Sequence, residues 1–402
     1  MGRVGFFDFL KGKKAADDPE SFQKLAIEVA RGLPFVERVE AHADEDFALD
    51  LDSEGRPGQI MYLHNLWAMA EGESLDDQRA IIAGFLEQMQ AQMPIPENWE
   101  TAKDRVFLAL RDATHHMSLL GREGFDAVSE PVLEDLLHVL CADLETTIVS
   151  VGNKQLEEWG VSLGEAWAVA LANTARFAPH LEPAEAGAMM RIQAGTIDAA
   201  SYLMAPGWLE RIADGRHVLA WAAERDWINV LVLDDELPYA AFAELALKEW
   251  EEASRSISPR LYTLAKGEVV PVTLPPDHEA FGALELARYK HRATQYAIQK
   301  EELDRWHEEN DVDIFVASFM VYETEDGYRS VVAWPDECLG LLPEVDVAIL
   351  MSDDGQPTEI PFEALVEAAG IAPSKTLFPR RYRVERWPDR EVLAELSAAF
   401  AG

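Results

Sequence analysis

Hydrophobic positions along this chain recur with both helical and strand spacing, and the two patterns are intermixed from end to end. The segment Leu163–Phe177 has the clearest helical start, because Ser162 can cap its first turn and Glu165 can complete a capping box. The segment Phe47–Asp52 alternates large apolar residues with small or acidic ones, as in a strand with one buried face. Helices and strands mixed in this way predict an α+β fold with antiparallel sheets packed against helices.

The same two patterns place the remaining elements. Helices are predicted over residues 19–33, 63–70, 82–89, 101–120, 153–160, 239–253, 277–310 and 362–369. Strands are predicted at 36–42, 146–149, 217–223, 227–234, around 261, and at 269–274, 315–322, 328–334, 345–351, 358–360 and 382–385. The hairpin of 217–223 and 227–234 is apolar on both faces, which indicates a covered position in a sheet. One narrow apolar stripe follows the longest helix, formed by Leu286, Tyr289, Ala293, Tyr296 and Leu303.

The chain of 402 residues exceeds what one hydrophobic core normally holds, so two or three subdomains are expected. The stretch 178–187 has two prolines and no periodic pattern, and Pro275-Pro276 precedes the long helix. We therefore predict a flexible leader at 1–18, an N-terminal α+β subdomain at 19–177, a middle α+β subdomain at 178–276, and a long helix with a strand-rich module at 277–402.

The net charge of the chain is strongly negative, with 73 acidic against 35 basic residues and a formal value of −38. Such a surface repels phosphate backbones, so general nucleic-acid binding is not expected, whereas protein partners or self-association are. Cys141 and Cys338 lie too far apart in sequence for a disulfide framework or zinc spacing, which fits a reducing compartment. No apolar run approaches the ~18 residues of a transmembrane helix, so we expect a cytoplasmic protein.

The leader combines three phenylalanines with three lysines in its first 14 residues. A segment of this kind could lie on an anionic membrane surface. It is only about ten residues long, shorter than most interfacial helices, so a frayed start is the simpler interpretation.

Three short segments carry a resemblance to a known family. The first spans 131–177 and contains Asp135-Leu136, Asp143, Trp159-Gly160, Ser162, Ala170 and Asn173. The second is Tyr62–Leu66 with the helix around Ile81-Ile82, and the third joins Ser201–Leu203 to a hairpin at Arg225-Asp226. Over residues 20–275 the chain resembles the YtpQ-like family of uncharacterised bacterial proteins, although Ala223 stands where the family pattern has a proline. The resemblance implies a bacterial α+β protein and assigns no activity.

Two charged clusters are the candidate binding sites. Arg225 and Asp226 occupy the tip of an apolar hairpin, where the guanidinium could recognise a ligand, although the pair also suits ordinary turn chemistry. The sign of the local charge reverses near the C-terminus, in a basic cluster of Lys375, Arg380, Arg381, Arg383, Arg386 and Arg390. In so acidic a chain this cluster should be neutralised, either by docking on an acidic face of this chain or a second subunit, or by an anion or acidic peptide, or by nucleic acid.

Asp112, His115 and His116 form the only local cluster that resembles a metal site. On the predicted helix 101–120, Asp112 and His116 would share a face while the two histidines diverge, which leaves too few ligands for tight zinc binding. Glycine-rich phosphate loops and dinucleotide motifs do not occur in the sequence. The sequence therefore predicts neither a metal nor a cofactor.

These observations favour a non-enzymatic protein-binding protein, either an adaptor or a chaperone-like protein. The alternative is a hydrolase whose site is assembled from distant residues, with His64, Asp198, Ser201 and Asp226 as its candidates. A deep pocket that brings a histidine and a carboxylate within reach of a hydroxyl would favour the enzyme. A broad docking surface would favour the adaptor.

Overall fold

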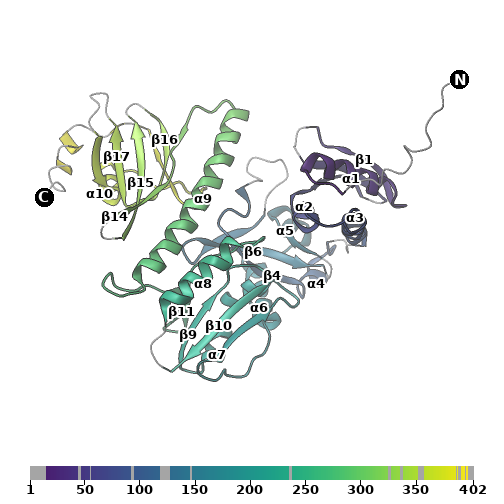
Figure 1. The fold of residues 1–402 in the computed structure, drawn as a ribbon, viewed down its shortest axis with the longest axis horizontal. Helices are drawn as coiled ribbons and strands as arrows, with labels where there is room; N and C mark the ends of the chain where they lie inside the picture. Colours follow the sequence, from purple (N-terminus) through teal and green to yellow (C-terminus); the bar gives the residue numbers. More distant parts are fainter. Residues whose placement is uncertain are drawn as a thin grey trace. The chain divides into compact units, whose positions relative to one another are not determined.

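The chain forms two compact units in a computed structural model (Figure 1), Met1–Pro94 with Leu144–Thr147, and Ile95–Asp143 with Ile148–Gly402. The structure describes residues 15–43, 47–54, 56–91, 95–117, 127–144, 147–234, 238–324, 327–335, 338–351, 357–385, 387, 391–393 and 395–396. Most of the predicted leader therefore lies outside the described residues. The sequence did not predict a division at Pro94, since it placed 19–177 in one subdomain. The boundaries predicted after 177 and 276 are instead crossed by continuous hydrophobic cores within the second unit.

The first unit packs helices on one face of a three-stranded antiparallel sheet. Its elements are α1 (Pro19–Arg31), β1 (Val36–Ala41), β2 (Ala48–Ser53), β3 (Arg56–Tyr62), α2 (His64–Ala70) and α3 (Leu75–Ala91), with the strands in the order β1-β2-β3. Asp18 caps α1 by accepting from the backbone N–H of Ser21. The buried ring of Phe22 meets Trp67 edge-on at 5.0 Å, so α1 and α2 share one core.

The second unit begins with a four-stranded sheet covered on both faces. Its elements are α4 (Trp99–Ala102), β4 (Val106–Asp112), β5 (Ser129–Val132), β6 (Leu136–Asp143), β7 (Ile148–Ser150), α5 (Asn153–Trp159) and α6 (Leu163–Phe177). The predicted caps are confirmed, since Gly160 ends α5 in the left-handed region and Ser162 caps α6. The predicted helix 101–120 is wrong. Residues 106–112 form the strand β4, because a short apolar run fits a two-sided buried strand as well as a helix.

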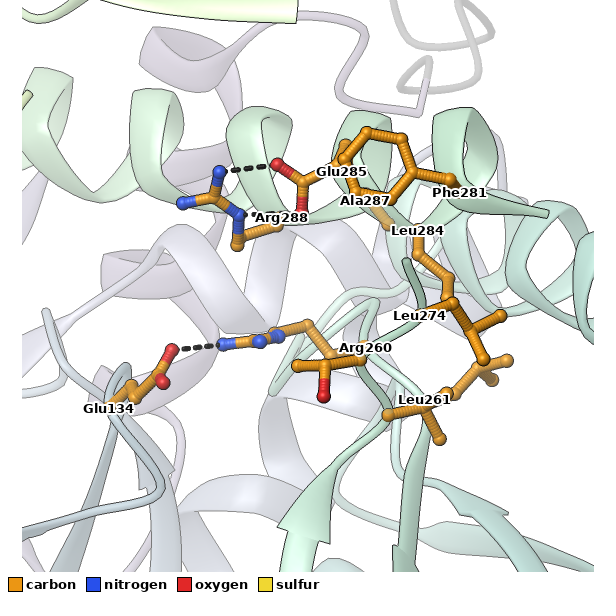
Figure 2. A pocket seen from close by; sticks show the side chains of 11 residues that line it. Glu134, Arg260, Leu261, Leu274, Phe281, Leu284, Glu285, Ala287 and Arg288 are labelled. Carbon is orange, nitrogen blue, oxygen red and sulfur yellow. Dashed lines mark hydrogen bonds and ion pairs between the residues drawn. The ribbon is translucent and has the colours of Figure 1, made fainter. Parts of the chain in front are cut away.

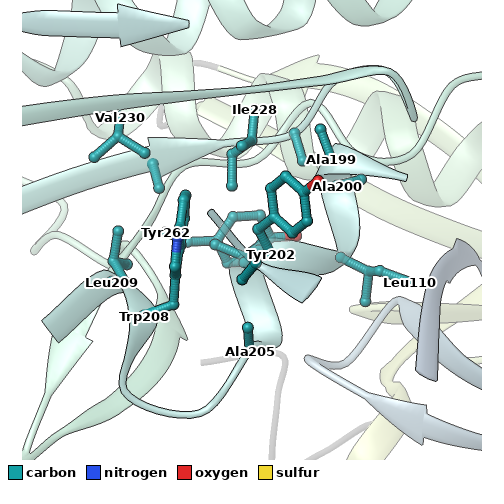
Figure 3. Close-up of a cluster of buried hydrophobic side chains, with 14 of the residues drawn as sticks. Leu110, Ala199, Ala200, Tyr202, Ala205, Trp208, Leu209, Ile228, Val230 and Tyr262 are labelled. Carbon is teal, nitrogen blue, oxygen red and sulfur yellow. The ribbon is translucent and has the colours of Figure 1, made fainter. Parts of the chain in front are cut away.

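A five-stranded antiparallel sheet follows, in the order β12-β11-β9-β10-β8. Its elements are β8 (Met189–Gln193), η2 (Ala199–Met204), α7 (Trp208–Ala213), β9 (His217–Trp221), β10 (Trp227–Leu233), α8 (Tyr239–Glu251), β11 (Tyr262–Ala265) and β12 (Glu268–Pro271). Figure 3 shows the core on one face, where Tyr202, Trp208 and Tyr262 pack together. The other face of β9 and β10 packs against α8, which confirms the predicted covered hairpin.

The last part of the second unit is a long helix and a strand-rich module. Its elements are α9 (Phe281–Glu309), β13 (Phe315–Val316), β14 (Met320–Thr324), β15 (Gly327–Pro335), β16 (Gly340–Pro343), β17 (Val347–Met351), β18 (Pro357–Pro361), α10 (Phe362–Ala369) and β19 (Arg381–Val384). The sheets run β14-β15-β17-β18 and β13-β16-β19. Most neighbours are antiparallel, whereas β15 pairs with β17 and β13 with β16 in parallel.

Helix α9 buries polar as well as apolar side chains. Tyr289, Tyr296 and Leu303 of the predicted stripe are buried. Four polar side chains of α9 are also buried and were not predicted to be, namely His291, Gln295, Gln299 and His307. A helix with a mixed polar and apolar buried face can form specific hydrogen bonds to its neighbours, and α9 does so between Tyr289 and Gln299. Within the described ranges, no helix combines the length and apolar character needed to cross a bilayer.

Candidate functional site

One face of α9 borders two adjoining cavities in the second unit. Phe281, Glu285, Arg288, Arg292 and Tyr296 follow at intervals of three or four residues, which places them on the same face of the helix. The rise of an α-helix makes this row about 22 Å long. Both cavities are lined by Glu134 and Arg288, so one follows the other along the row. We call the combined depression the α9 groove.

The end of the α9 groove near the start of the helix is partly apolar and has a volume of about 320 Å³. Figure 2 shows two ion pairs at this end, Glu285 with Arg288 on the helix and Glu134 with Arg260 opposite. The apolar part of the lining consists of Leu261, Val272, Leu274, Phe281, Leu284 and Ala287. Because both arginines have carboxylate partners, this end offers an apolar surface with neutralised charges at its border.

The other end of the α9 groove is larger and more polar, with a volume of about 560 Å³. Four parts of the chain surround it: the β5–β6 turn, helix α9, the segment at Glu344, and residues 378–380. The lining consists of Pro131, Val132, Leu133, Glu134, Asp135, Arg288, Arg292, Tyr296, Glu344, Phe378, Pro379 and Arg380. Three arginines thus face one cavity in a chain that carries a large excess of acid.

Asp135 links the β5–β6 turn to α9 and to the segment before β11. Its carboxylate is almost fully buried and accepts from Arg260 at 3.0 Å and from Arg292 at 3.2 Å. Its backbone carbonyl accepts from the side chain of Gln295 at 2.9 Å. Burial alone would raise the pKa of this carboxyl, but the surrounding positive charges, Arg292 first, hold it below the usual value of 3.8. The carboxylate is therefore ionised and fixes both guanidiniums.

Two guanidiniums of the polar end have N–H groups that no described residue accepts from. The described partner of Arg292 is Asp135, which binds only its Nε atom, and this leaves both terminal nitrogens for another acceptor. Arg380 is exposed, and none of the residues that the structure describes bonds its guanidinium. Glu344 also lines this cavity, and its carboxylate has no hydrogen-bond partner among the described residues. Hydrogen-bonding groups of both signs that have no described partner therefore line the same cavity.

The backbone of the β5–β6 turn is strained where it lines the groove. Leu133 and Glu134 adopt φ values of 49° and 57°, in the left-handed region that residues with a Cβ rarely occupy. Each such residue costs on the order of 1 kcal/mol. Glycine or asparagine would relieve the strain, but only these side chains place an apolar and an acidic group in the groove. Retained strain of this kind is typical of ligand-binding segments.

The basic cluster predicted near the C-terminus is divided by the fold. Arg380 lines the α9 groove, whereas Arg383 is exposed on β19 beside Glu385 at 3.3 Å. Arg381 is completely buried, and its guanidinium binds Gln299 at 2.6 Å together with the carbonyls of Ala317 and Leu341. It contacts polar groups of its own chain instead of an acidic face, so it is not available to a ligand. Arg386 and Arg390 lie outside the described residues.

The other predicted binding pair, Arg225 and Asp226, lies at the β9–β10 turn away from the α9 groove. Arg225 is largely buried, and its guanidinium donates to Nδ1 of His115 at 3.2 Å. Asp226 forms an ion pair with Arg255. Burial is the main reason why the pKa of Arg225 falls to about 10. The pair connects the turn to its neighbours, and no described cavity is lined by either residue.

The histidine cluster does not have the predicted helical arrangement, because β4 ends at Asp112 and a turn carries His115 and His116. Asp112 is bound by Thr114 at 2.5 Å, by His291 at 2.7 Å and by Gln295 at 2.6 Å. Its carboxylate therefore binds two side chains of α9, those of His291 and Gln295. Over the described part of the chain, no three side chains of His, Cys, Asp or Glu are grouped so that they could hold a metal ion.

Burial keeps both histidines of this turn neutral. Desolvation, followed by the charges of Arg225 and Arg111, lowers the pKa of His115 from 6.5 to about 2. Desolvation and the same two arginines lower the pKa of His116 to about 4. The unfolded chain binds protons at these sites near 6.5, so the free energy of unfolding falls as the pH drops below that value.

Replacing His115 with glutamine is therefore expected to flatten this dependence on pH. Between about pH 6.5 and pH 5 the fall in unfolding free energy should shrink by roughly 1–2 kcal/mol, because each unit of pKa difference corresponds to about 1.4 kcal/mol. Urea unfolding of the wild type and the variant at the two pH values measures the effect. Equal slopes for the two proteins would show that His115 is not held neutral.

The hydrolase candidates are not brought together. His64 belongs to the first unit, where its ring meets Phe47 edge-on at 5.2 Å. In the second unit, Asp198 forms a buried ion pair with Arg111 at 2.5 Å, and the hydroxyl of Ser201 accepts from the backbone N–H of Leu110 at 3.0 Å. Because β4 is an outer strand of its sheet, the backbone N–H of Leu110 has no partner strand, and the hydroxyl of Ser201 accepts its hydrogen bond instead. The structure assigns each of these side chains a partner within its own unit.

A histidine, a carboxylate and a hydroxyl do meet at Asp112, but in an order unsuited to nucleophilic catalysis. Both His291 and Thr114 bind the carboxylate, which lies between them. A nucleophile needs the histidine as its direct hydrogen-bond partner. His291 is also completely buried. This arrangement holds β4 against α9 and provides no activated hydroxyl.

Comparisons with protein-family models, with curated proteins and with solved structures found no match. The arginines of the α9 groove were not among the predicted site residues, apart from Arg380. The sequence does contain one signal for them, because Arg288, Arg292 and Tyr296 are spaced by four and share a helical face. Arg260 and Asp135 join them only through the tertiary fold.

Proposed function

We propose that this protein is a non-catalytic binding protein that holds an extended segment of a partner protein in the α9 groove. The observation that supports this proposal is the polar end of the groove, where Arg292 and Arg380 have N–H groups without acceptors within the described ranges of the chain. A charge-assisted hydrogen bond from a ligand would satisfy each of them. The reactive side chains considered above are bound to structural partners, which leaves recognition as the role that this site can fulfil.

The shape of the α9 groove favours an elongated ligand. Each cavity alone has the volume of a small-molecule pocket, but the two meet end to end along about 22 Å of helix. An extended chain rises about 3.3 Å per residue, so six or seven residues would span the groove. A compact metabolite would fill one end and leave the other empty.

The edge of the five-stranded sheet adds a second means of recognition. Strand β12 is the outermost strand of that sheet, and the residues that continue it, Val272, Thr273 and Leu274, line the apolar end of the groove. An edge strand leaves backbone donors and acceptors available to an added strand. A bound segment could therefore pair with this edge while its side chains enter the cavities.

Peptides selected from a random display library against the full-length chain test this proposal. The selected peptides should bind the wild type, and Thr273→Trp should weaken them at least tenfold because the indole would fill the apolar end. Thr294→Trp makes the same replacement at an exposed position of α9 outside the groove, so it is the matched control and should bind normally. Fluorescence polarisation with labelled peptides measures both variants.

Two results of this experiment would decide the question. Selected peptides that bind Thr273→Trp as well as the wild type would contradict the assignment of the groove. Self-association of the wild type that disappears in Thr273→Trp, measured by sedimentation, would identify a segment of a second copy as the occupant.

A further inference from the structure

The charges along the α9 groove specify which kind of segment it would accept. Near Leu284 the lining is apolar and its arginines are neutralised by Glu134 and Glu285. Near Arg292 two guanidiniums have N–H groups for which the described part of the chain provides no acceptor. The groove therefore changes from apolar to polar along its length, and three arginines and three carboxylates line the polar end.

We infer that the bound segment carries an apolar residue and an acidic residue four positions apart. This inference rests on the function proposed above. Leu284 and Arg292 are eight residues apart on α9, which corresponds to about 12 Å along the helix axis. In an extended segment about 12 Å equals between three and four residues. Side chains that point to the same side of a strand are separated by an even number of residues, so the spacing is four.

A carboxylate is the group that would accept hydrogen bonds from these two guanidiniums. Arg292 lines the cavity and is held there by Asp135, which accepts from its Nε atom. Arg380 lines the same cavity from the segment before β19. A guanidinium can bind both oxygens of one carboxylate in the parallel geometry that arginine favours, and a second arginine can add a further charge-assisted hydrogen bond.

Glu344 weakens the binding of an acidic segment, so it allows a test in which removing a charge should increase affinity. Its carboxylate lines the same cavity and lacks a hydrogen-bond partner among the residues described. It repels an acidic ligand, so removing its charge should strengthen binding, whereas removing the charge of Arg380 should weaken it. Arg380 is suited to this comparison because its exposed guanidinium has no described structural bond to lose.

The experiment uses fluorescein-labelled peptides of seven residues, built from glycine and serine with one leucine and one aspartate four positions apart, in either order. We expect at least one order to bind the full-length wild type, and replacement of its aspartate by asparagine to weaken binding about tenfold. Arg380→Gln should weaken the aspartate peptide about tenfold and leave the asparagine peptide unchanged. Glu344→Gln should strengthen the aspartate peptide about threefold, and Arg383→Gln, on the exposed part of β19, should have no effect.

Moving the aspartate by one position should also weaken binding, because the side chain would then point away from the arginines. Equal affinities of the aspartate and asparagine peptides, or of Arg380→Gln and the wild type, would overturn the inference. If display-selected peptides bind the groove but lack an acidic residue, this inference fails and the proposed function stands. If no peptide binds the wild type, both fail.

Discussion

Replacing Asp135 with asparagine is expected to lower the free energy of unfolding of the second unit by roughly 3–5 kcal/mol at pH 7. The carboxylate is almost fully buried and neutralises two guanidiniums, those of Arg260 and Arg292. Asparagine has the same shape but no charge, so both arginines would remain in a largely buried site with one weak acceptor. Urea unfolding followed by near-ultraviolet circular dichroism measures the loss.

The dependence of this effect on pH follows from the lowered pKa of Asp135. A carboxyl whose folded-state pKa lies below 3.8 stabilises the protein above that pH, and the stabilisation disappears as the pH falls through the folded value. The difference between wild type and Asp135→Asn should therefore be constant near neutral pH and shrink below about pH 3.8. If the difference in unfolding free energy between the two proteins did not change below pH 3.8, the carboxyl of Asp135 would not be ionised in the folded protein.

Glu134→Gln is the matched control for this prediction. Glu134 binds the same Arg260 at 2.8 Å, but 57% of its side chain is exposed to solvent. Exposed ion pairs contribute about 0–1 kcal/mol, so this variant should unfold nearly as the wild type does. Equal losses from the two substitutions would show that burial of Asp135 is not the cause of its effect.

Arg381→Ala is expected to destabilise the strand-rich module by roughly 3–5 kcal/mol. The side chain is completely buried between α9 and the sheet β13-β16-β19, and it donates to Gln299, Ala317 and Leu341. Alanine would leave a cavity and would remove the donor from the Gln299 side chain and the Ala317 carbonyl. Thermal and urea unfolding of the variant measure the loss.

Two further variants separate the causes of this loss. Arg381→Met keeps most of the volume without the hydrogen bonds, so it should recover about 1–2 kcal/mol of the cavity contribution. Arg383→Ala, two residues along β19, removes an arginine whose side chain is 60% exposed and should change stability by less than about 0.5 kcal/mol. If Arg381→Ala unfolds like Arg383→Ala, the buried guanidinium contributes nothing to the module.

Local chemistry explains which elements could be predicted. The cap at Ser162, the glycine at position 160 and the covered hairpin of β9 and β10 each depend on neighbouring residues, and the structure confirms all three. The strand β4 was missed because its apolar run, Val106–Leu110, has no alternation that would distinguish a two-sided strand from a helix. Its neighbour β6 lies more than twenty residues further along the chain and gives no local signal.

The candidate site was harder to predict, because its members come from distant segments. Asp135, Arg260 and Arg292 are separated by more than 30 residues from one another and meet only in the folded chain. The basic residues around Arg381 were predicted as one cluster, since sequence alone cannot show that one arginine of such a cluster is buried by its own module. Arg381 opens β19 and is buried, whereas Arg380 lies just before the strand and is exposed, so the two have different roles.

By itself the amino-acid sequence determined the α+β class, most of the helices, and the strongly acidic character of this protein, because these depend on composition and on patterns within about twenty residues. The tertiary structure alone decided the division at Pro94, the strand β4 and the α9 groove. The physical reason is that burial and hydrogen-bond partners are properties of segments brought together by folding. A side chain such as Arg292 acquires its environment from Asp135, not from its neighbours on the helix.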